Sequence, residues 1–598
     1  MFDPRIYRAA LIPVLFAFVL LAFSLENRPQ PLRTSLAPDA FQINRAFDRA
    51  YVAAPNGKSL VDRFPDRRPG SDGDTRMAAT VAAQMRAAGF RVRTVEHEGD
   101  TIDGRQTLRT VIGQRPGTID ERIVVVAHRD AAGHRAEAEL SGTATLLELA
   151  RIFGAPRQAR HTVTLVSTSG GSGGAAGAAK LADELSDEPV GAVLVLGDLV
   201  SRNVRAPLVT GWSNALGASS QRLRATVQEA VRAETGSRSG APRALNQFAR
   251  FAMPATFGEQ GPLLASGLPA VLLSIGGDLP PPADAPISRD RMEAFGRAAL
   301  RTLTVLDAAP ASRPITAQAT SRDLLTSRKI VPVWAVRLFV GALLLTVIVT
   351  AVDAFAALRR RREPAAVWLR WTAANTLPFV LTALFAIVLG AIGLLGAVPG
   401  APAPPQALPA EPAGLLAVAL VFALGWFWLR PVVLRALRAD GVERSEPGAG
   451  VIIVLVATAV ACVMWISNPY AAALLVPALH VWLFALSPDL RMRPAVRFTL
   501  ATLGVVPVAI VLISLARSLG LDGIDAAWEL LLLTAGGHIS LASLALWSIV
   551  AGCTVSALLI AAHGAAPVAD DDLPITVRGP RSYAGPGSLG GTESALRR

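Results

Sequence analysis

Two patterns of hydrophobic and polar positions divide the chain near residues 310 to 330. Before this boundary, short runs of β-branched residues alternate with segments whose apolar residues recur every three or four positions. Beyond it, long apolar segments are separated by charged breaks. The first pattern predicts strands alternating with helices, and the second predicts helices long enough to cross a membrane.

The clearest strand signal lies at residues 123–126, where four β-branched residues follow one another. His128 and Asp130 come directly after this strand, and a helical pattern begins after Ser141 and Gly142. Similar alternation continues through residues 45–314. It predicts an α/β domain with a mixed, mostly parallel sheet and helices on both faces.

An apolar run at residues 9–25, about the length that crosses a bilayer, begins the chain after a short basic segment at residues 1–8. A cleaved signal peptide is the alternative interpretation. We favour an uncleaved anchor because no clear small-x-small cleavage site precedes Glu26 and the run is long for a signal peptide. Residues 26–44 are then expected to be a linker.

Seven further membrane spans are predicted within residues 331–562, after a polar tether at 315–330. Their expected positions are 331–357, 367–397, 414–436, 449–467, 470–487, 497–516 and 539–562. Residues 526–537 could form a helix at the membrane interface. The polar tail at 563–598 is expected to be disordered.

Arginines between the apolar segments predict their orientation. Every second break is rich in arginine, including those at Arg359, Arg435 and Arg493, whereas the intervening breaks hold only Arg517. Because cytoplasmic loops carry the excess of positive charge, we expect eight spans in the plasma membrane with both termini in the cytoplasm. Residues 26–330 would then lie outside the cytoplasm.

The composition supports a membrane protein and argues against two other classes. Hydrophobic residues make up 52% of the 598-residue chain, and the mean hydropathy is +0.41. The net charge of +12 comes almost entirely from arginines that are scattered or flank apolar runs, so a lipid bilayer rather than a nucleic acid is the expected partner. Cys462 and Cys553 lie in apolar segments and form no disulfide framework or cysteine zinc motif.

The strand, the His128-x-Asp130 motif, the loop ending in Ser141-Gly142 and the following helix resemble the core of the M28 family of zinc aminopeptidases and carboxypeptidases. The resemblance covers roughly residues 45–310. It implies a zinc-aminopeptidase-like fold, joined here to a multi-span membrane region. It also implies peptide hydrolysis at a site with two zinc ions.

Three positions match the family's zinc site. By this resemblance, His128 and Asp198 correspond to two ligands of one ion, and Asp130 corresponds to the residue that orients the histidine. The other site positions differ. Ala138 stands where the bridging aspartate is expected, and Gly170 and the glycine after it replace the general base and a glutamate ligand.

The family's late histidine ligand is also missing, since no histidine lies between His161 and His480. Catalytic zinc usually has three protein ligands, so zinc could bind but is expected to be absent or weakly held. Substitute ligands could come from acidic or imidazole side chains near the site. The candidates are His134, Glu137, Glu139, Glu259 and Asp278. The glycine run at 170–174 could cradle an anion, but it lacks the Walker lysine and the dinucleotide-binding spacing.

Three functions remain open on these grounds. We favour an integral membrane protein whose M28-like domain has lost hydrolysis and binds a peptide, protein or glycan as a binding or scaffold module. The first alternative is a membrane-anchored zinc aminopeptidase with a rewired metal site. The second is a transporter with an accessory exported domain, for which Asn375 and His480 are the deeper intramembrane polar residues.

Overall fold

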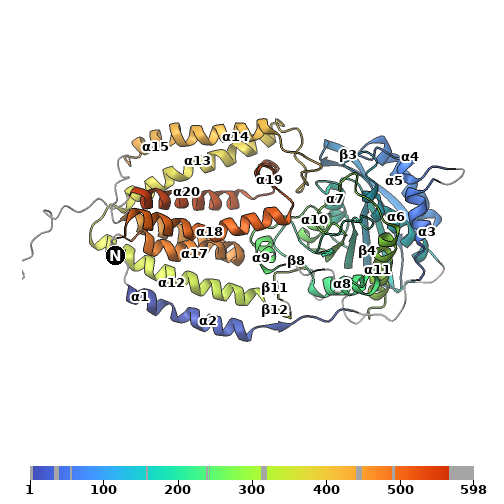
Figure 1. Cartoon of the computed structure of the whole chain (residues 1–598), viewed down its shortest axis with the longest axis horizontal. Helices are drawn as coiled ribbons and strands as arrows, with labels where there is room; N and C mark the ends of the chain where they lie inside the picture. The colour runs from blue at the N-terminus through green and yellow to red at the C-terminus, as the bar shows by residue number, and fades with distance from the viewer. Residues whose placement is uncertain are drawn as a thin grey trace, which may run out of the picture.

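An α/β domain and a helical bundle lie end to end along the longest axis of the molecule (Figure 1). The computed structural model describes residues 4–32, 39–53, 57–155, 159–237, 240, 243–310, 320–326, 328–439, 448–487, 490 and 492–563. The expected tail beyond His563 and parts of the expected linker and tether lie outside these residues.

The α/β domain is built on a seven-stranded sheet with the strand order β2-β3-β5-β4-β6-β9-β7. Its strands are β2 (Arg91–Thr101), β3 (Gly104–Arg115), β4 (Ile119–His128), β5 (His161–Thr168), β6 (Val190–Leu196), β7 (Val209–Thr210) and β9 (Ala270–Leu273). The four central strands β5, β4, β6 and β9 are parallel, and the hairpin β2–β3 and the short β7 pair antiparallel at the edges.

Both faces of this sheet are covered by helices because both faces of its central strands are apolar. In β4, Ile123 and Val125 face one hydrophobic cluster, and Val124 and Val126 face another. The first cluster includes residues of α3 (Ile43–Tyr51), α5 (Asp72–Ala87), α6 (Ser141–Phe153), α8 (Gln221–Thr235) and α11 (Arg289–Asp307). The second includes α7 (Ala176–Glu184) and α10 (Gln260–Ala265). The predicted fold class is confirmed.

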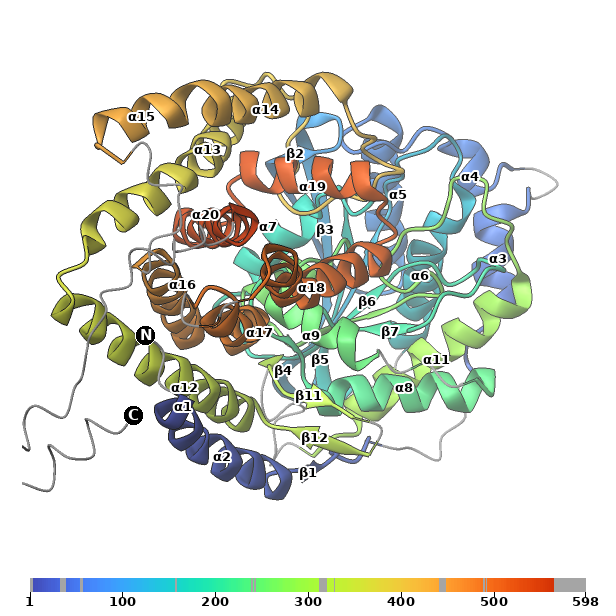
Figure 2. The same ribbon diagram turned by 60° about the vertical axis from the view of Figure 1, so that its left-hand side comes forward.

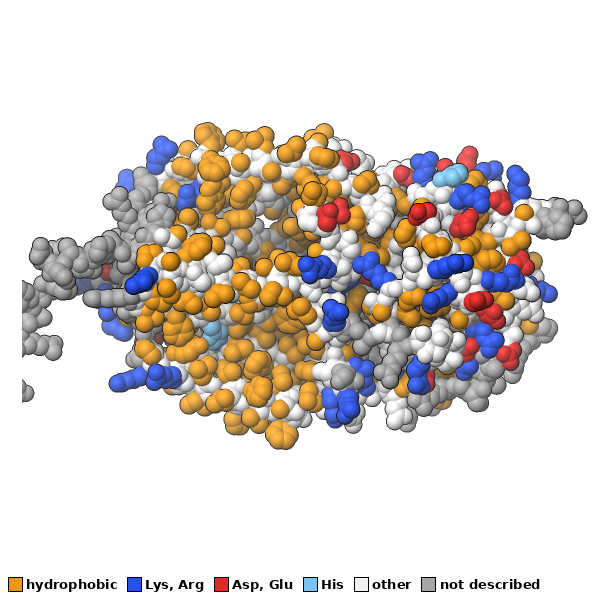
Figure 3. Space-filling view, viewed as in Figure 1, with side chains coloured by type: hydrophobic (Ala, Val, Ile, Leu, Met, Phe, Trp, Pro, Cys, Tyr) orange, Lys and Arg blue, Asp and Glu red, His pale blue; other side chains and the backbone are white. Residues whose placement is uncertain are grey.

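Seven described helices are long and apolar enough to cross a membrane. They comprise α1–α2 (Pro4–Ala10 and Ile12–Phe23), α12 (Val333–Arg360), α13 (Ala365–Ala391), α14 to α15 (Pro412–Leu424 and Arg430–Ala436, joined by a π-helical turn), α16 (Gly448–Ser467), α18 (Pro494–Ser518) and α20 (Leu541–His563). Hydrophobic side chains cover most of the visible face of this part, whereas charged side chains gather over the α/β domain (Figure 3). These helices support a membrane protein.

Two of the expected spans differ in extent from the helices. The segment expected at 470–487 forms α17 (Pro469–Ala485), a 17-residue helix packed between α16 and α18. The span expected at 367–397 ends earlier, at Ala391, because Gly393 adopts a left-handed φ of 68° that stops the helix. A loop at residues 392–411 then follows.

The N-terminal helices pack along α12 (Figure 2). The hydroxyl of Thr346 donates a hydrogen bond of 2.8 Å to the carbonyl oxygen of Ala10. After α2, the strand β1 (Glu26–Asn27) pairs with β12 (Lys329–Val331). The first helix therefore packs against the bundle through α12.

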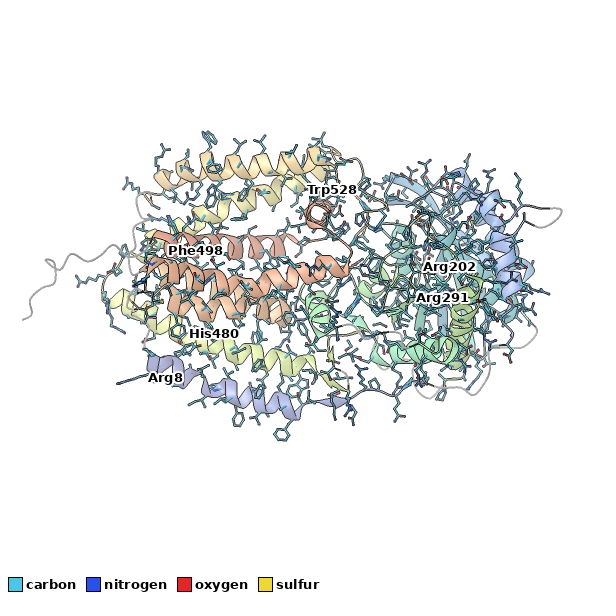
Figure 4. All side chains as sticks on the ribbon, viewed as in Figure 1. Arg8, Arg202, Arg291, His480, Phe498 and Trp528 are labelled. Atoms are coloured by element: carbon cyan, nitrogen blue, oxygen red, sulfur yellow. The ribbon has the colours of Figure 1, made fainter. Side chains whose placement is uncertain are left out.

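The α/β domain docks on the bundle through α9 (Ala244–Ala252), which packs against α17 and α18. The side-chain amide of Asn468 donates to the carbonyl oxygens of Phe251 (2.9 Å) and Ala252 (3.2 Å), and the rings of Phe251 and Tyr470 stack. The helix α19 (Gly523–Ala535), which carries Trp528, lies across the end of the bundle near the domain, and Arg8 lies toward the opposite end (Figure 4). The two parts thus share one continuous packed junction.

Candidate functional site

The parallel strands carry the candidate site residues to one edge of the sheet. His128 is the last residue of β4, Thr168 is its register partner at the end of β5, and Asp198 follows β6 by two residues. A cavity of about 50 Å³ opens there. Its lining includes His128, Glu139, Asp198, Glu259 and Asp278. Residues that are far apart in the sequence therefore share one small cavity, as is usual at the carboxyl edge of such sheets.

His128 and Asp130 form a coupled pair at the wall of the cavity. Nδ1 of His128 lies 3.1 Å from the backbone oxygen of Asp130 and 3.7 Å from its carboxylate Oδ1. Burial opposes a charge on His128, but Asp130 and the more distant Glu259 outweigh it and raise the pKa of His128 to about 10. Burial also opposes ionisation of Asp130, yet His128 and the hydrogen bonds from Ser172 lower the pKa of Asp130 to about 2.

The carboxylate of Asp130 also fixes the glycine-rich loop after β5. It accepts hydrogen bonds from the backbone N–H groups of Gly171 (3.1 Å) and Ser172 (2.9 Å) and from the Ser172 hydroxyl (2.6 Å). Charge-assisted bonds of this kind are among the stronger hydrogen bonds in proteins. Asp130 therefore holds the loop directly against His128.

This close approach leaves no room for a side chain at position 171. A Cβ atom added to Gly171 would lie 2.3 Å from Cβ of His128, a distance that real Cβ atoms do not reach. The preceding Gly170 has a φ of 84°, which side chains rarely adopt. The glutamate pair of the M28 pattern could not be restored here without moving the loop.

Glu259 occupies the space that this loop leaves. Its carboxylate carbon lies 3.1 Å from the Cβ position of Gly171. The Thr168 hydroxyl donates a hydrogen bond of 2.5 Å to Oε1 of Glu259, whereas Oε2 has no hydrogen-bond partner among the described residues. Burial raises the pKa of Glu259. A carboxylate thus enters the site from α10's first turn instead of from the loop after β5.

Glu139 also lines the cavity, from the 3-10 helix η1 (Glu137–Leu140). It is buried, and burial raises its pKa to about 7. The preceding loop holds Arg135 and Ala136 at positive φ angles of 62° and 24°. Arg67 stabilises this strained loop by donating to the backbone oxygens of both residues.

Asp198 completes the group of carboxylates. Its Oδ1 accepts the backbone N–H groups of Val200 and Ser201 at 3.0 Å each, and its Oδ2 has no hydrogen-bond partner among the described residues. Burial raises the pKa of Asp198. The two backbone hydrogen bonds to Oδ1 therefore fix the position of the side chain.

The remaining candidates are engaged elsewhere. Asp278 also lines the cavity, but its Oδ2 lies 2.8 Å from Arg250 in a buried ion pair. The carboxylate of Glu137 lies 3.3 Å from Arg135 outside the cavity lining, and His134 is exposed. The structure therefore brings His128, Glu139, Asp198, Glu259 and Asp278 to the cavity and leaves Glu137 and His134 outside it.

The possible ligands around the cavity do not have the arrangement of a zinc site. Among the residues that the structure describes, no three or more His, Cys, Asp and Glu side chains are arranged to hold one metal ion. Carboxylate oxygens such as those of Glu139, Asp198 and Glu259 can bind zinc, but these side chains do not form such a group. The two-zinc arrangement of the M28 pattern does not fit these residues.

A loop of the membrane region also lines the cavity. Pro404, from the loop between α13 and α14, is part of the lining. The Cβ position of Gly173 lies 3.5 Å from Cβ of Ala403, and that of Gly174 lies 2.6 Å from Cβ of Pro399. Small residues at 173 and 174 thus allow the membrane loop to approach the glycine-rich loop.

Thr168, Ser172 and Pro404 were missed as site residues by the sequence analysis. Ser172 lies within the glycine-rich segment where the M28 pattern already pointed, so it could have been found. Pro404 had no local signal, because it follows Asp278, the last of the charged lining residues, by 126 positions and meets the site only through docking of the two parts.

Comparisons with known proteins find matches that cover less than half of the chain. The sequence model of Peptidase family M28 matches residues 110–248. A glutaminyl cyclase from an Acidobacteriales bacterium is 18% identical, covering 46% of this chain and 98% of that chain, with a TM-score of 0.34. A zinc aminopeptidase from Bacillus subtilis is 10% identical, covering 44% of this chain and 94% of that chain, with a TM-score of 0.33. No curated protein sequence matches the chain.

Proposed function

Residues 110–248 form part of an M28 peptidase domain that is joined to a bundle of membrane-length helices, and from this premise we propose a non-hydrolytic binding function. In this proposal the domain lies outside the cytoplasm and binds a peptide or protein ligand in the cavity at the strand ends. The bundle anchors it and holds it against the membrane.

One observation supports the proposed loss of hydrolysis. The backbone of Gly171 lies so close to His128 that a Cβ at this position would be 2.3 Å from Cβ of His128. The loop that supplies the general base and one zinc ligand in the M28 pattern is therefore packed in a form that admits neither. Removal of a general base alone typically costs about 10² to 10⁴ in rate.

The proposal is tested with the full-length protein in lipid nanodiscs, purified without chelators. We expect no hydrolysis of aminopeptidase substrates, and zinc well below one equivalent by mass spectrometry. His128→Ala and Asp198→Ala serve as comparison variants. Hydrolysis that both substitutions abolish would contradict the proposal.

The second candidate is a zinc aminopeptidase with a rewired site. It is favoured by the position of Glu259, whose carboxylate lies beside the place from which the M28 glutamate ligand would branch. A zinc ion held by His128, Asp198 and Glu259 would require these side chains to move, because no three described His, Cys, Asp and Glu side chains are arranged to hold one. Near-stoichiometric zinc that disappears in both variants, together with peptide hydrolysis, would favour this candidate.

A transport function has less support from the polar residues of the bundle. The side-chain amide of Asn375 donates to the hydroxyl of Ser556 (2.9 Å), and its oxygen accepts from Arg430 (2.6 Å). His480 pairs with the hydroxyl of Tyr7 at 2.8 Å. Asn375 and one ring nitrogen of His480 are hydrogen-bonded across helices, whereas Nε2 of His480 has no partner among the described residues, so the contacts support mainly a packing role.

For the membrane topology we propose a plasma-membrane protein with both termini in the cytoplasm and residues 26–330 outside. The excess of arginine in alternate loops supports it. Reporter fusions after Arg362 and near Gly400 should report opposite sides of the membrane. If both report the same side, this topology is wrong.

A further inference from the structure

Arg224, on α8, is a buried arginine whose side chain has no partner in the described part of the chain. The buried arginines among the described residues are Arg67, Arg129, Arg224, Arg250 and Arg497. The other four donate hydrogen bonds to backbone oxygens, whereas the guanidinium of Arg224 makes no hydrogen bond or ion pair with a described residue. Buried arginines are normally paired, so this exception indicates a partner that the chain does not supply.

The guanidinium of Arg224 is largely buried but can still be reached from the surface. The residue is 5% exposed, and its Nε is fully buried without a partner. Its two terminal nitrogens also lack partners among the described residues, but they are not fully buried. Burial and the charge of Arg28 lower the pKa of Arg224 to about 10, and Asp323 opposes this shift. The side chain therefore stays charged at neutral pH and presents N–H donors at the surface.

Other hydrogen-bond donors near Arg224 are also unused. Gln221 lies three positions earlier on the same face of α8, and its side-chain nitrogen has no described partner. A Cβ added to Gly211 would lie 3.0 Å from Cδ of Arg224 and 2.5 Å from Cβ of Ser219, whose hydroxyl has no described partner either. The Gln221 nitrogen and the Ser219 hydroxyl are covered by the protein and cannot touch a ligand directly. They do show that this region has more donors than acceptors.

Arg28 brings a second positive charge to the same place. Its Nη2 donates to the backbone oxygen of Thr326, and its Nε has no described partner. The backbone N–H of Leu32 donates to the hydroxyl of Thr226 on α8 at 3.1 Å, so the segment after Arg28 runs along the helix that carries Arg224. The two guanidinium groups therefore lie near each other, as the effect of Arg28 on the pKa of Arg224 also indicates.

The nearby carboxylate of Asp323 is engaged elsewhere. Its Oδ1 accepts the backbone N–H of Val333, the first residue of α12, at 2.9 Å, and its Oδ2 accepts the hydroxyl of Ser321 at 2.8 Å. Asp323 forms no ion pair with either arginine in the described structure. One engaged carboxylate beside two arginines leaves an excess of positive charge, which favours an anionic ligand.

This place lies where two membrane-length helices meet the α/β domain. Arg28 follows directly after β1, which comes after α2 and pairs with β12, the strand that leads into α12. The strand β8 (Ala218–Ser219) precedes α8 and pairs with β10 (Thr320–Ser321). Both ribbon views show β12 and α8 at the boundary between the bundle and the domain (Figure 1, Figure 2). When such helices cross a bilayer, their ends lie at the level of the lipid headgroups.

We propose that Arg224 and Arg28 bind a phosphate group at this boundary, either in the headgroup of a phospholipid or as a free phosphate ion. Guanidinium groups match phosphate oxygens with paired N–H donors. Side chains of a helix tilt toward its N-terminus, so Arg224 lies beside the first turn of α8, which the side chain of Ser220 does not cap. The positive end of this helix adds to the attraction for an anion. The site is separate from the cavity at the strand ends and does not depend on the function proposed for that cavity.

The experiment measures lipid binding to the full-length protein in detergent by native mass spectrometry. The probe is dioleoyl phosphatidylglycerol, and the matched probe is dioleoylglycerol, which has the same acyl chains but no phosphate. We expect the protein to retain phosphatidylglycerol in preference to dioleoylglycerol. Arg224→Gln and Arg28→Gln should each weaken this binding by about tenfold, because each removes charge-assisted hydrogen bonds. In a second arm, inorganic phosphate is added during thermal unfolding.

Arg232→Gln is the matched control, because it removes the same charge from α8 at an exposed position where Arg232 pairs with Glu229. Its affinity for phosphatidylglycerol should equal that of the wild-type protein. Without lipid or phosphate, Arg224→Gln should unfold at the wild-type temperature or above it, since it removes a buried charge that has no partner. A lower unfolding temperature would show that Arg224 stabilises the fold itself and would overturn the proposal.

The remaining outcomes distinguish the two sources of phosphate. Binding of phosphatidylglycerol that both substitutions weaken identifies a lipid headgroup. If this lipid is not retained but inorganic phosphate raises the unfolding temperature of the wild-type protein and not of Arg224→Gln, the ligand is a free phosphate ion. Equal retention of the two lipids, with no effect of inorganic phosphate, would overturn the phosphate site.

Discussion

Two clusters of buried charged side chains lie near the same edge of the sheet, and they differ in whether an arginine pairs with the carboxylate oxygen that lacks a hydrogen bond. In the first cluster, Nε of Arg129 lies 2.8 Å from Oδ1 of Asp74, and Oδ2 of Asp74 accepts the Ser169 hydroxyl at 2.7 Å. In the second, the carboxylates of Glu139 and Glu259 each retain an unpartnered oxygen at the cavity.

The difference indicates what each cluster does. Arg129 connects strand ends and the start of α5, because its guanidinium also donates to backbone oxygens of Arg109 and Ser167. Such a network rigidifies a fold when all its members are satisfied. A buried carboxylate oxygen that has neither a hydrogen bond nor an ion pair calls for an explanation, such as a bound water, ion or ligand. We therefore assign the first cluster to the framework, and the proposed function would assign the second to ligand binding.

The largest expected effect follows from breaking the framework cluster. Arg129→Met should lower the free energy of unfolding by about 3 to 5 kcal/mol, because it leaves Asp74 buried without its ion-pair partner. Chemical denaturation of the detergent-solubilised protein would measure it. Arg202→Met is the control, since Arg202 is exposed on the α/β domain (Figure 4) and should cost under about 1 kcal/mol. Similar losses of unfolding free energy for both variants would show that Arg129 stabilises the fold no more than an exposed arginine does.

The next effect concerns the loop that separates the clusters. Gly171→Glu reintroduces the residue type of the M28 pattern, and we expect it to destabilise the protein by about 3 kcal/mol without producing hydrolysis. The new Cβ would overlap His128, and overpacking of this kind typically costs about 1 to 3 kcal/mol. Gly523→Ala, whose Cβ meets no atom within 4 Å, should be nearly neutral. A stable, hydrolytic Gly171→Glu variant would show that the loop can return to a catalytic form.

Replacing Glu139 should stabilise the protein, whereas replacing Arg129 should destabilise it. Its folded-state pKa of about 7 lies above the ordinary value of 4.5, so its favourable contribution is present below pH 4.5 and is lost as the pH rises through 7. Glu139→Gln should therefore stabilise the ligand-free protein by about 2 kcal/mol at pH 8 and by little at pH 5. Unfolding curves at both pH values provide the measurement. A destabilised variant at pH 8 would place Glu139 in the framework cluster.

The smallest effect is expected where the two clusters adjoin. Ser172→Ala removes the hydroxyl that donates to Asp130 at 2.6 Å but retains the backbone N–H bond, so we expect a loss of about 1.5 kcal/mol. Thermal unfolding beside Ser186→Ala, whose hydroxyl bonds only to a nearby exposed backbone oxygen, would measure it. No difference between the two would mean that the backbone bonds alone hold the loop.

Much of the fold could be predicted because its causes are local. The β-branched run at 123–126 forms the centre of β4, and His128 ends that strand as expected. Ser71 begins α5 by accepting the backbone N–H of Asp74, a capping role typical of serine. The apolar segments of the second half became helices for the same reason, since length and composition suffice to define them.

Only some of the site residues could be predicted from the sequence. His128, Asp130 and Asp198 could be placed because each adjoins a parallel strand, and such strands end at one edge. Glu259 was named as a substitute, but its approach to Gly171 depends on how α10 packs against the sheet. The contribution of Pro404 to the cavity lining depends on docking between two parts of the chain that share no sequence signal.

The sequence by itself determined the alternation of strands and helices, the membrane-length helices and the absence of side chains at positions 170 and 171. Only the tertiary structure decided that Glu259 would occupy the space left by Gly171, that three carboxylates would keep unpartnered oxygens, and that a membrane loop would cover them. The periodicity of apolar residues and the geometry of the backbone depend on a few neighbouring residues, so they can be predicted from the local sequence. Burial and hydrogen-bond satisfaction depend on neighbours that are distant in sequence, so they exist only in the folded molecule.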